Sequence, residues 1–345
     1  MDKTALQCFA NEVIAWQRAC GRHGLPWQVS DPYARWISEI MLQQTQVASV
    51  IPYFTRFMAA YPDVASLAAA RGDDVMRLWA GLGYYRRAEN LLKCARLIVR
   101  DYGGKFPQSA QELAALPGIG ESTAAAIAAF SFGEKAAIFD GNVRRVFARL
   151  TDFGEPVDGP AAKKLFRIVQ SALPDEDIAD YTQGVMDLGA TVCVKRPKCA
   201  SCPVSAMCLA RQSGRESLLP LKKAKKPRPE KERTFFLIWK DDRALFLPQK
   251  EKGVWKGLYV LPSEEGCLSG EEALKKAREI AGGITGFQKL SGFTHVFTHF
   301  RLTGHVYAAR AQEAGEGFYA LGEKALPSPI SKLVAGFFSG APLSL

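Results

Sequence analysis

The chain has 345 residues, which is enough for two domains, and its 48% hydrophobic content is ample for a buried core. No apolar run approaches the roughly 20 residues that cross a bilayer, and charged residues interrupt the N-terminal stretch, so we expect neither a membrane protein nor a secretory leader. The formal net charge is +10, which favours a polyanionic partner. A solvated run of basic residues is the commoner explanation of such a surplus, so the partner must be argued from other features.

Residues 222–233 hold half of that excess charge and predict a domain boundary. They contain seven basic and two acidic residues, two prolines and no large apolar side chain. This composition is typical of an extended linker. We therefore expect an all-α region at 1–221 and a separate α+β domain at 234–345.

The region before the linker carries helical patterns that glycine and proline interrupt. The N-terminal stretch reads as an amphipathic helix, and Asp31-Pro32 reads as an N-cap followed by proline at the first helical position. The apolar residues that follow at helical spacing are Trp36, Ile37, Ile40 and Met41. Further helices are predicted at about 45–60, 73–80, 84–102, 109–115, 121–131, 141–151, 160–172 and 175–190.

After the linker the pattern changes to that of strands. Residues 234–240, 243–249 and 305–310 are short runs rich in β-branched and aromatic side chains. One helix is predicted among them, at about 270–281. We find no internal repeat.

Four cysteines form the most specific motif, with the spacing C-x5-C-x2-C-x5-C; they are Cys193, Cys199, Cys202 and Cys208. Zinc ribbons usually pair two C-x2-C steps across a longer gap. A single C-x2-C step between two longer ones suits the four-thiolate ligation of a 4Fe–4S cluster, with zinc as the alternative. The other four cysteines are scattered and read as buried or free thiols rather than as disulfides.

Two further motifs lie upstream of the cysteines. LPGIGESTA, at 116–124, predicts a tight hairpin that leads into a helix. There Gly118 and Gly120 permit positive φ and close backbone approach, and the free N–H groups of the helix can hold an anion. About twenty residues later, Asp140 occupies an expected helix N-cap in the motif DGNVRRV. A plain helix–turn–helix and a plain capping aspartate are the alternative readings.

In this order the motifs resemble those of the helix–hairpin–helix DNA glycosylases of the endonuclease III type, and within that superfamily those of the adenine DNA glycosylases. The segments that match are 38–47, 81–91, 116–124, 140–146, 186–193 and the four cysteines. The resemblance covers nearly the whole chain. One departure is that the family usually places six residues between the first two cysteines, whereas this chain has five.

The resemblance implies a multidomain enzyme of base excision repair. Residues 1–221 would be an all-α helix–hairpin–helix catalytic region with an iron–sulfur cluster loop at 193–208, residues 222–233 a basic linker, and residues 234–345 a Nudix-like domain that recognises 8-oxoguanine. The implied enzyme is a monomeric, monofunctional glycosylase of the bacterial cytoplasm. It would remove adenine mispaired with 8-oxoguanine or guanine in double-stranded DNA. The alternatives are an endonuclease III-like enzyme for oxidised pyrimidines and a catalytically silent damage-binding protein.

Cleaving an N-glycosidic bond requires a proton for the leaving base and an anion beside the developing oxocarbenium ion, which is work for two carboxyl groups. Glu39 lies at the margin of an apolar helical face, where its pKa should be raised, although a solvated glutamate is the ordinary alternative. The resemblance implies that Glu39 protonates adenine at N7 and later activates water. It implies that Asp140, ionised, stabilises the sugar cation or binds it covalently. Asn142, in the same motif, is assigned to the catalytic site with them.

Ser122 distinguishes branches of the superfamily, because relatives that also nick the strand carry a lysine there, whose amine forms a Schiff base with the sugar. A serine hydroxyl with no evident base cannot do this, so Ser122 indicates a monofunctional glycosylase. Since the target base must leave the stack, the resemblance assigns Gln44 and Tyr84 to filling or wedging the duplex. The other substrate- and DNA-binding positions that it implies are Trp27, Leu42, Gln43, Gly118, Gly120 and Gln183. Of these, Gln183 stands where some relatives have glutamate, and on composition alone Tyr84, Trp27 and Leu42 would be core residues.

In the last domain, Phe297-Thr298-His299 resembles the Phe-Ser-His loop with which this family reads 8-oxoguanine, and threonine keeps the hydroxyl. Nothing in the sequence matches the Nudix hydrolase box, so we expect recognition rather than hydrolysis. His295, His299 and His305 are spaced by four and six residues on strand-like sequence, which does not predict a metal site.

Overall fold

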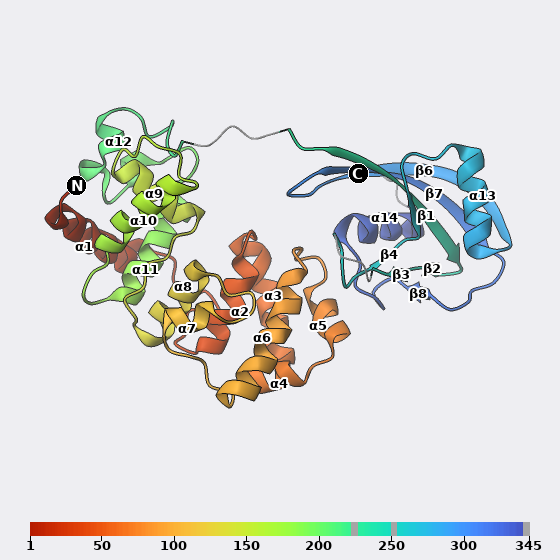
Figure 1. Cartoon of the computed structure of the whole chain (residues 1–345), viewed down its shortest axis with the longest axis horizontal. Helices are drawn as coiled ribbons and strands as arrows, with labels where there is room; N and C mark the ends of the chain where they lie inside the picture. The colour runs from red at the N-terminus through yellow and green to blue at the C-terminus, as the bar shows by residue number, and fades with distance from the viewer. Residues whose placement is uncertain (222–226, 250–253, 341–345) are drawn as a thin grey trace. The chain divides into compact units, whose positions relative to one another are not determined.

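The computed structural model describes residues 1–221, 227–249 and 254–340. Contacts between Cα atoms divide the chain into two compact units (Figure 1). The helical unit comprises Met1–Ala69 and Asn90–Lys225, and the sheet unit comprises Ala70–Glu89 and Lys226–Leu345. Residues 222–226 of the predicted linker lie outside the described residues. Within the described part, no helix is both long and apolar enough to cross a membrane.

Most of the predicted helices are present in the helical unit. Its helices are α1 (Lys3–Cys20), α2 (Pro32–Leu42), α3 (Val47–Ala60), α4 (Val64–Ala69), most of α6 (Arg86–Tyr102), α7 (Ala110–Ala114), α8 (Glu121–Phe132), α9 (Gly141–Leu150), α10 (Pro160–Ser171), α11 (Ile178–Asp187) and α12 (Leu209–Gln212). The short helix α4 was not predicted. The last long helix starts at Ile178, later than predicted, because Asp177 before it has a φ of 56°. It continues into a π-helical turn, Leu188–Val192, which leads directly to Cys193.

Helix α2 begins as its sequence predicts. The Asp31 carboxylate accepts hydrogen bonds from the N–H groups of Tyr33 (3.2 Å) and Ala34 (3.0 Å), and proline occupies the first turn. The apolar face of the helix is buried, whereas Glu39 at its margin is half-buried. The cap and the apolar stripe together fix the depth at which this carboxyl group lies.

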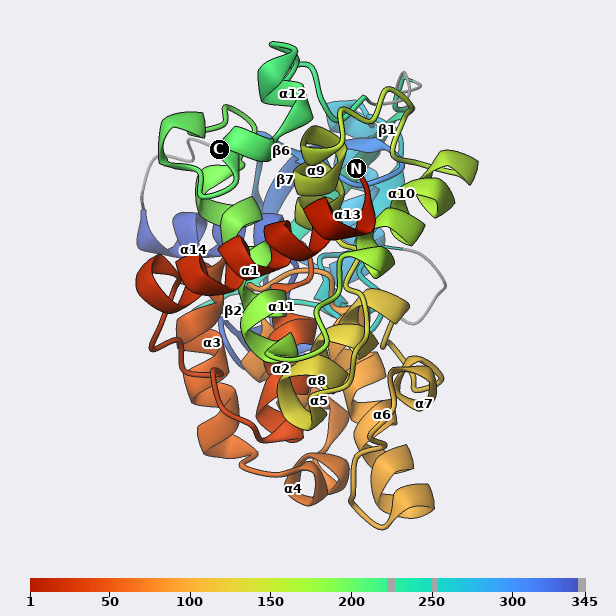
Figure 2. The ribbon, with the colours of Figure 1, turned by 90° about the vertical axis from the view of Figure 1, so that its left-hand side faces the viewer.

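Helix α1 packs along α11 (Figure 2). The ring of Phe9 meets that of Tyr181 edge-on, with centroids 6.4 Å apart. At Gly184 a Cβ atom would lie 2.7 Å from Val13 Cγ1, so only glycine permits this approach. This packing holds the end of α11 from which the cysteine loop departs.

The sheet unit contains a mixed sheet with the strand order β6-β7-β1-β2-β8, and β5 pairs with β1 as well. The strands of the unit are β1 (Glu230–Lys240), β2 (Arg243–Leu245), β3 (Leu247–Pro248), β4 (Tyr259–Val260), β5 (Ser263–Glu265), β6 (Ile284–Val296), β7 (Arg301–Ala311) and β8 (Phe318–Ala320). Strands β1 and β7 are parallel, and the other pairs are antiparallel. The helices of the unit are α5 (Gly72–Trp79), α13 (Gly270–Ala281) and α14 (Ser328–Ser339).

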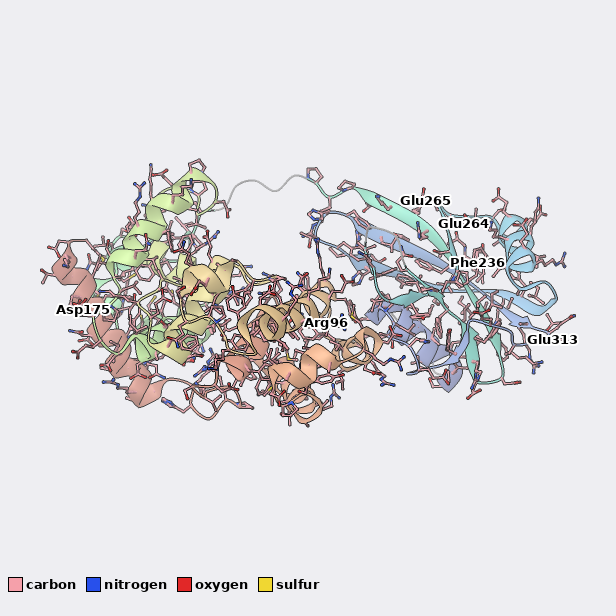
Figure 3. All side chains as sticks on the ribbon, turned by 60° about the horizontal axis from the view of Figure 1, so that its bottom comes forward. Arg96, Asp175, Phe236, Glu264, Glu265 and Glu313 are labelled. Carbon is pink, nitrogen blue, oxygen red and sulfur yellow. The ribbon has the colours of Figure 1, made fainter. Side chains whose placement is uncertain are left out.

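Both faces of this sheet are covered by helices. Phe235 and Leu237 of β1 belong to the apolar cluster that α14 completes, whereas Phe236 and Ile238 belong to the one that α13 completes. In Figure 3 the labelled Phe236 lies within the sheet layer, and Glu313 lies at the surface. Burial on both faces explains why β1 reads as an uninterrupted apolar run.

The predicted strands are present, but the sheet extends beyond them. Residues 230–233, assigned to the linker from sequence, belong to β1 and pair with residues 301–304 of β7. Strand β6 and helix α14 were not predicted. Strand β6 lies at the sheet edge, is largely exposed and has two register shifts, so its sequence lacks the alternation by which strands are recognised.

Candidate active site and cysteine cluster

The predicted hairpin joins α7 to α8. Gly118 has a φ of 81°, and a Cβ atom there would lie 2.7 Å from Asn90 Cβ. Gly120 differs from the expectation, because its φ is −87° and a Cβ atom would meet no atom within 4 Å. The hairpin therefore needs glycine at 118 for backbone geometry, whereas Gly120 leaves open space at the start of α8, which has no side-chain cap.

Asp140 is the N-cap of α9, as predicted. Its Oδ1 accepts hydrogen bonds from the N–H groups of Asn142 (2.9 Å) and Val143 (2.8 Å). Ser122 does not cap its own helix. Its Oγ accepts a hydrogen bond from the N–H of Phe139 at 2.9 Å, which ties the hairpin helix to the residue before Asp140.

Glu39 lies near enough to Asp140 for the two carboxyl groups to interact electrostatically. Burial raises the pKa of Glu39 to about 7; the Arg35 guanidinium opposes this rise and the Asp140 carboxylate adds to it. Arg35 itself is buried and donates from Nε to the carbonyl oxygen of Val29 at 2.7 Å. The site thus combines a carboxyl group that keeps its proton near neutral pH with a second one anchored by backbone N–H groups.

Two arginines of α9 attach this helix to the cysteine loop. Arg145 donates to three oxygens: Asn142 Oδ1 (2.7 Å), the Gly189 carbonyl (2.6 Å) and the Cys193 carbonyl (2.6 Å). A Cβ atom at Gly189 would lie 2.7 Å from Asn142 Cβ, so the π-helical turn packs directly on α9. Asn142 is thereby held by the hydrogen bond from Arg145 and by the packing of Gly189.

Arg149 lies one turn further along α9 and is buried, with 3% of its surface exposed. Its guanidinium donates to Cys193 Sγ (3.3 Å) and to the carbonyl oxygens of Val194 (2.7 Å), Lys195 (3.2 Å) and Leu219 (3.0 Å). These bonds satisfy a buried cation and hold the first half of the loop.

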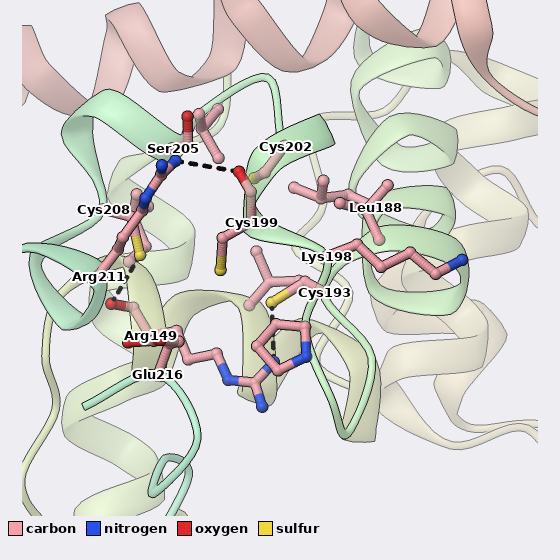
Figure 4. Close-up of a pocket in the computed structure, with 15 residues that line it drawn as sticks. Arg149, Leu188, Cys193, Lys198, Cys199, Cys202, Ser205, Cys208, Arg211 and Glu216 are labelled. Atoms are coloured by element: carbon pink, nitrogen blue, oxygen red, sulfur yellow. Dashed lines mark hydrogen bonds between the residues drawn. The ribbon is translucent and has the colours of Figure 1, made fainter. Parts of the chain in front are cut away.

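The four cysteines line one pocket together with apolar side chains (Figure 4). The Cys208 thiol donates to the Arg149 carbonyl oxygen at 3.4 Å, and Arg211 donates to the Cys199 carbonyl oxygen at 3.0 Å. In the described ranges, no group of three or more His, Cys, Asp or Glu side chains is arranged to hold a metal ion. The loop nonetheless brings four cysteine side chains to the lining of one pocket.

Burial raises the pKa of Cys202 to about 11 and raises the pKa of Cys199 and Cys208 as well. Metal binding would have to displace these protons. The basic residues of the loop, Lys195, Arg196 and Lys198, are exposed.

The end of α2 and the loop that follows it carry three of the predicted DNA-binding residues. Gln44 is exposed and has a φ of 59°, which is uncommon for a residue other than glycine. Gln43 donates to Thr123 Oγ1 of α8 at 3.2 Å, and Leu42 is half-buried. Trp27 is buried, and its ring meets that of Phe54 edge-on, with centroids 5.4 Å apart.

Gln183, a predicted pocket residue, is hydrogen-bonded within its own helix. Its Nε2 donates to Asp187 Oδ1 at 2.8 Å. The buried Asp187 carboxylate also accepts from the backbone N–H of Arg22 (2.7 Å) and from its Nε (2.8 Å). The structure thus gives Gln183 a structural partner that the sequence had not indicated.

Tyr84 belongs to the sheet unit. Its side chain is 55% exposed and its φ is 49°. The Arg87 guanidinium lies 5.3 Å from the centroid of its ring. An exposed aromatic ring on a strained backbone is unusual for a core residue, so the core reading of Tyr84 is wrong.

Phe297, Thr298 and His299 lie on the predicted turn, between β6 and β7. The N–H of Phe297 donates to the Phe300 carbonyl oxygen at 2.9 Å, which closes the turn. The Phe297 ring packs on Phe300 (4.6 Å between centroids) and Trp255 (5.4 Å), whereas Thr298 and His299 are exposed. Phe297 therefore anchors the loop, and the other two side chains face outward.

Arg145 and Arg149 were not recognised from sequence as holding the cysteine loop. A detectable signal was their spacing of four residues, which places them on one face of α9, with Arg149 between the apolar residues Ala148 and Leu150.

Comparison with known proteins gives consistent matches to both units. Residues 37–174 match the HhH-GPD superfamily of base excision DNA repair proteins, and residues 234–336 match the NUDIX domain. The chain is 36% identical to an adenine DNA glycosylase of Buchnera aphidicola over 95% of this chain and 97% of that protein. It is 32% identical to the adenine DNA glycosylase of Homo sapiens over 89% of this chain and 67% of that protein. A solved thermostable thymine-DNA glycosylase aligns with a TM-score of 0.54 and 28% identity, covering 61% of this chain and 98% of that one.

The raised pKa of Glu39 predicts a pH-dependent gain in stability for Glu39→Gln. Ionising Glu39 opposes folding, and this cost grows as the pH rises from the unfolded value near 4.5 to the folded value of about 7. The gain in melting temperature over wild type should therefore be larger at pH 8 than at pH 5. Glu12→Gln, at an exposed site on α1, is the control and should show no such difference. An equal effect of Glu39→Gln at both pH values would contradict the burial argument.

Proposed function

The chain belongs to the adenine DNA glycosylase family, and we propose that it removes adenine paired with 8-oxoguanine and, more slowly, adenine paired with guanine. As a member of this family it is a DNA glycosylase of base excision repair, and DNA is its partner. The observation that carries the proposal is the pair of carboxyl groups: Glu39, with its pKa of about 7, and Asp140, whose charge contributes to that raised pKa. We further propose that it acts as a monomer in the bacterial cytoplasm.

Glu39 is the proposed acid. A pKa near the working pH keeps a large fraction of the carboxyl groups protonated, so Glu39 can donate to N7 of adenine as the base departs. The carboxylate left behind then accepts a proton from the attacking water. This exchange of roles within one group is the pattern expected of glycosidic hydrolysis.

Asp140 is the proposed anion for the sugar. Its Oδ1 is held by two backbone N–H groups, so the carboxylate keeps a fixed position while the oxocarbenium ion forms. Asn142 is fixed beside it by Arg145. The Ser122 hydroxyl accepts from the Phe139 N–H and supplies no amine, which supports hydrolysis without strand cleavage.

Gln44 and Tyr84 are the residues proposed to assist base flipping, because both are exposed and both have a positive φ. Exposed residues with strained backbones are common at ligand-binding sites. Trp27 and Leu42 would line the adenine pocket, while the hairpin at Gly118 and Gly120 and the start of α8 would hold a phosphate. Gln183 would contribute by fixing Asp187 and the end of α11, since its amide is engaged there.

The cysteine loop is proposed to bind a 4Fe–4S cluster through Cys193, Cys199, Cys202 and Cys208. Two observations support this proposal: the four cysteines line one pocket, and their spacing, with a single C-x2-C step between two longer ones, suits four-thiolate ligation of such a cluster. Ligation by all four cysteines would cross-link the loop, and Lys195, Arg196 and Lys198 would then face phosphate.

Residues 234–345 are proposed to recognise the lesion. 8-Oxoguanine differs from guanine in having an N7–H donor and an O8 acceptor, and a hydroxyl and an imidazole can sense both changes. Thr298 and His299 are exposed on a turn that Phe297 anchors, which is the arrangement such a reader requires.

The excision assay tests the central proposal. A duplex with one A:8-oxoguanine pair should break at the adenine only after alkali treatment, because the product is an intact abasic strand. Glu39→Gln should lower the rate by at least ~10²–10⁴-fold while mismatch binding survives, because the proton donor is lost. Glu12→Gln should excise at the wild-type rate. Near-normal excision by Glu39→Gln would refute the assignment, and strand cleavage without alkali, with borohydride cross-linking, would support the endonuclease III-like alternative.

Metal analysis tests the cluster. Protein purified without oxygen should be brown and contain about four irons per chain. The measurement is elemental analysis together with the visible absorption spectrum. Stoichiometric zinc without iron would overturn the cluster proposal and leave the excision proposal intact.

The double variant Thr298→Ala/His299→Ala tests lesion reading. Each good base contact is worth about 1–3 kcal/mol, so the single-turnover rate on A:8-oxoguanine should fall by about fivefold or more, with little change on A:G. His23→Ala, at an exposed site in the helical unit, is the control. Equal losses on both mismatches would mean that the loop adds only general affinity.

A further inference from the structure

Residues 81–84, called the Tyr84 segment below, are held in a strained conformation by several contacts. Gly81 and Gly83 have φ values of 96° and 76°, and Tyr84 follows at 49°. The Gly83 carbonyl oxygen accepts from Trp79 Nε1 at 3.1 Å and from Arg87 Nη2 at 3.0 Å. A non-glycine residue in this region keeps its conformation only while its surroundings enforce it.

One of these contacts reaches residues far away in the sequence. The buried Tyr85 hydroxyl donates to the Leu326 carbonyl oxygen at 3.2 Å and lies at the same distance from the Gly81 N–H, which donates to it. A single oxygen atom thus joins the start of the Tyr84 segment to the chain just before α14.

A second set of contacts joins the loop at 297–300 to α5 and to the start of α6, the two helices that flank residues 81–84 in the sequence. Trp255 has a φ of 63°, and its ring lies 5.4 Å from that of Phe297. Two residues on, a Cβ atom at Gly257 would lie 2.8 Å from Glu89 Oε1 and 3.1 Å from Met76 Cε. The backbone at Gly257 therefore packs directly on α5 and on the start of α6, on either side of Tyr84.

We propose that Tyr85 and residues 255–257 hold Tyr84 in place, and that they hold it more firmly when the loop at 297–300 contacts 8-oxoguanine than when it meets guanine. The proposal rests on the lesion reading proposed above for Thr298 and His299. When the loop meets 8-oxoguanine, Phe297 and Trp255 fix residues 255–257 against α5, and the Tyr85 hydroxyl fixes Gly81. Tyr84 is then held ready to wedge the duplex. With guanine the loop gains no such contact, so the wedge is held less firmly. Tyr85 is thus a positioning residue that contributes to the choice of mismatch.

The test is a double-mutant cycle on the ratio of single-turnover rates for A:8-oxoguanine and A:G. Tyr85→Phe removes the hydroxyl and both of its hydrogen bonds, and should lower this ratio by at least about three- to tenfold, the factor that one hydrogen bond is worth. In the Thr298→Ala/His299→Ala background, Tyr85→Phe should lower it no further, because the lesion contact is already lost. Gly257→Ala, which forces Glu89 and Met76 away, should lower the ratio in the same way.

Tyr33→Phe is the matched control, because Tyr33 is also buried (4% exposed, against 9% for Tyr85) and its hydroxyl donates to the Tyr61 carbonyl oxygen at 2.8 Å. It should lower the melting temperature about as much as Tyr85→Phe and leave the ratio unchanged. An unchanged ratio in Tyr85→Phe, or a further fall in the loop-variant background, would overturn the link while leaving lesion reading intact. A wild-type ratio of one would instead overturn lesion reading itself, and the link with it.

Discussion

Arg145 and Arg149 attach helix α9 to the cysteine loop, and the geometry of the candidate active site depends on that attachment. Asp140 caps the N-terminus of this helix, so the position of its carboxylate depends on how firmly the helix is held. The Arg145 guanidinium donates hydrogen bonds both to the π-helical turn and to Asn142. The buried Arg149, one turn later on α9, donates to the cysteine loop. A group bound by the cysteines would therefore stiffen the support of a carboxylate that it never touches.

The two carboxyl groups differ because the sequence gives them different surroundings. Glu39 sits at the edge of an apolar face, where desolvation disfavours its charge, and Arg35 on the same helix limits that effect. Asp140 faces backbone N–H groups, which complement a negative charge. Burial and capping thus give two identical functional groups different charge states, as their proposed tasks require. The expected cost is a stability that falls as the pH rises from about 4.5 to about 7.

Local signals in the sequence predicted the features that depend on short-range chemistry. Asp31 and Asp140 at helix starts, the tight turn at Gly118 and the shared pocket of four cysteines all follow from spacing within about twenty residues. Features set by distant partners were missed. Strand β6 is defined by its pairing with β7 rather than by its own alternation, and the Asp187 carboxylate is held by Arg22, which is 165 residues away in the sequence. The sequence also could not indicate that Phe297 anchors its loop, since that depends on Trp255.

Backbone strain recurs at the residues proposed to meet DNA or to support those that do. Six described residues other than glycine have positive φ values, and three of them are Gln44 (59°), Tyr84 (49°) and Trp255 (63°). The other three are aspartates, a residue type that adopts this conformation more readily: Asp152, Asp177 and Asp241. Unstacking a base costs a few kcal/mol, and a side chain that must also be ordered on binding would add to that cost. A residue already held in its final conformation would add little, so strain maintained by the folded protein would lower the barrier to the proposed flipping. For the wedge role proposed for Tyr84, the contacts that Trp79, Tyr85 and Arg87 make with its segment would be as important as the exposed ring itself.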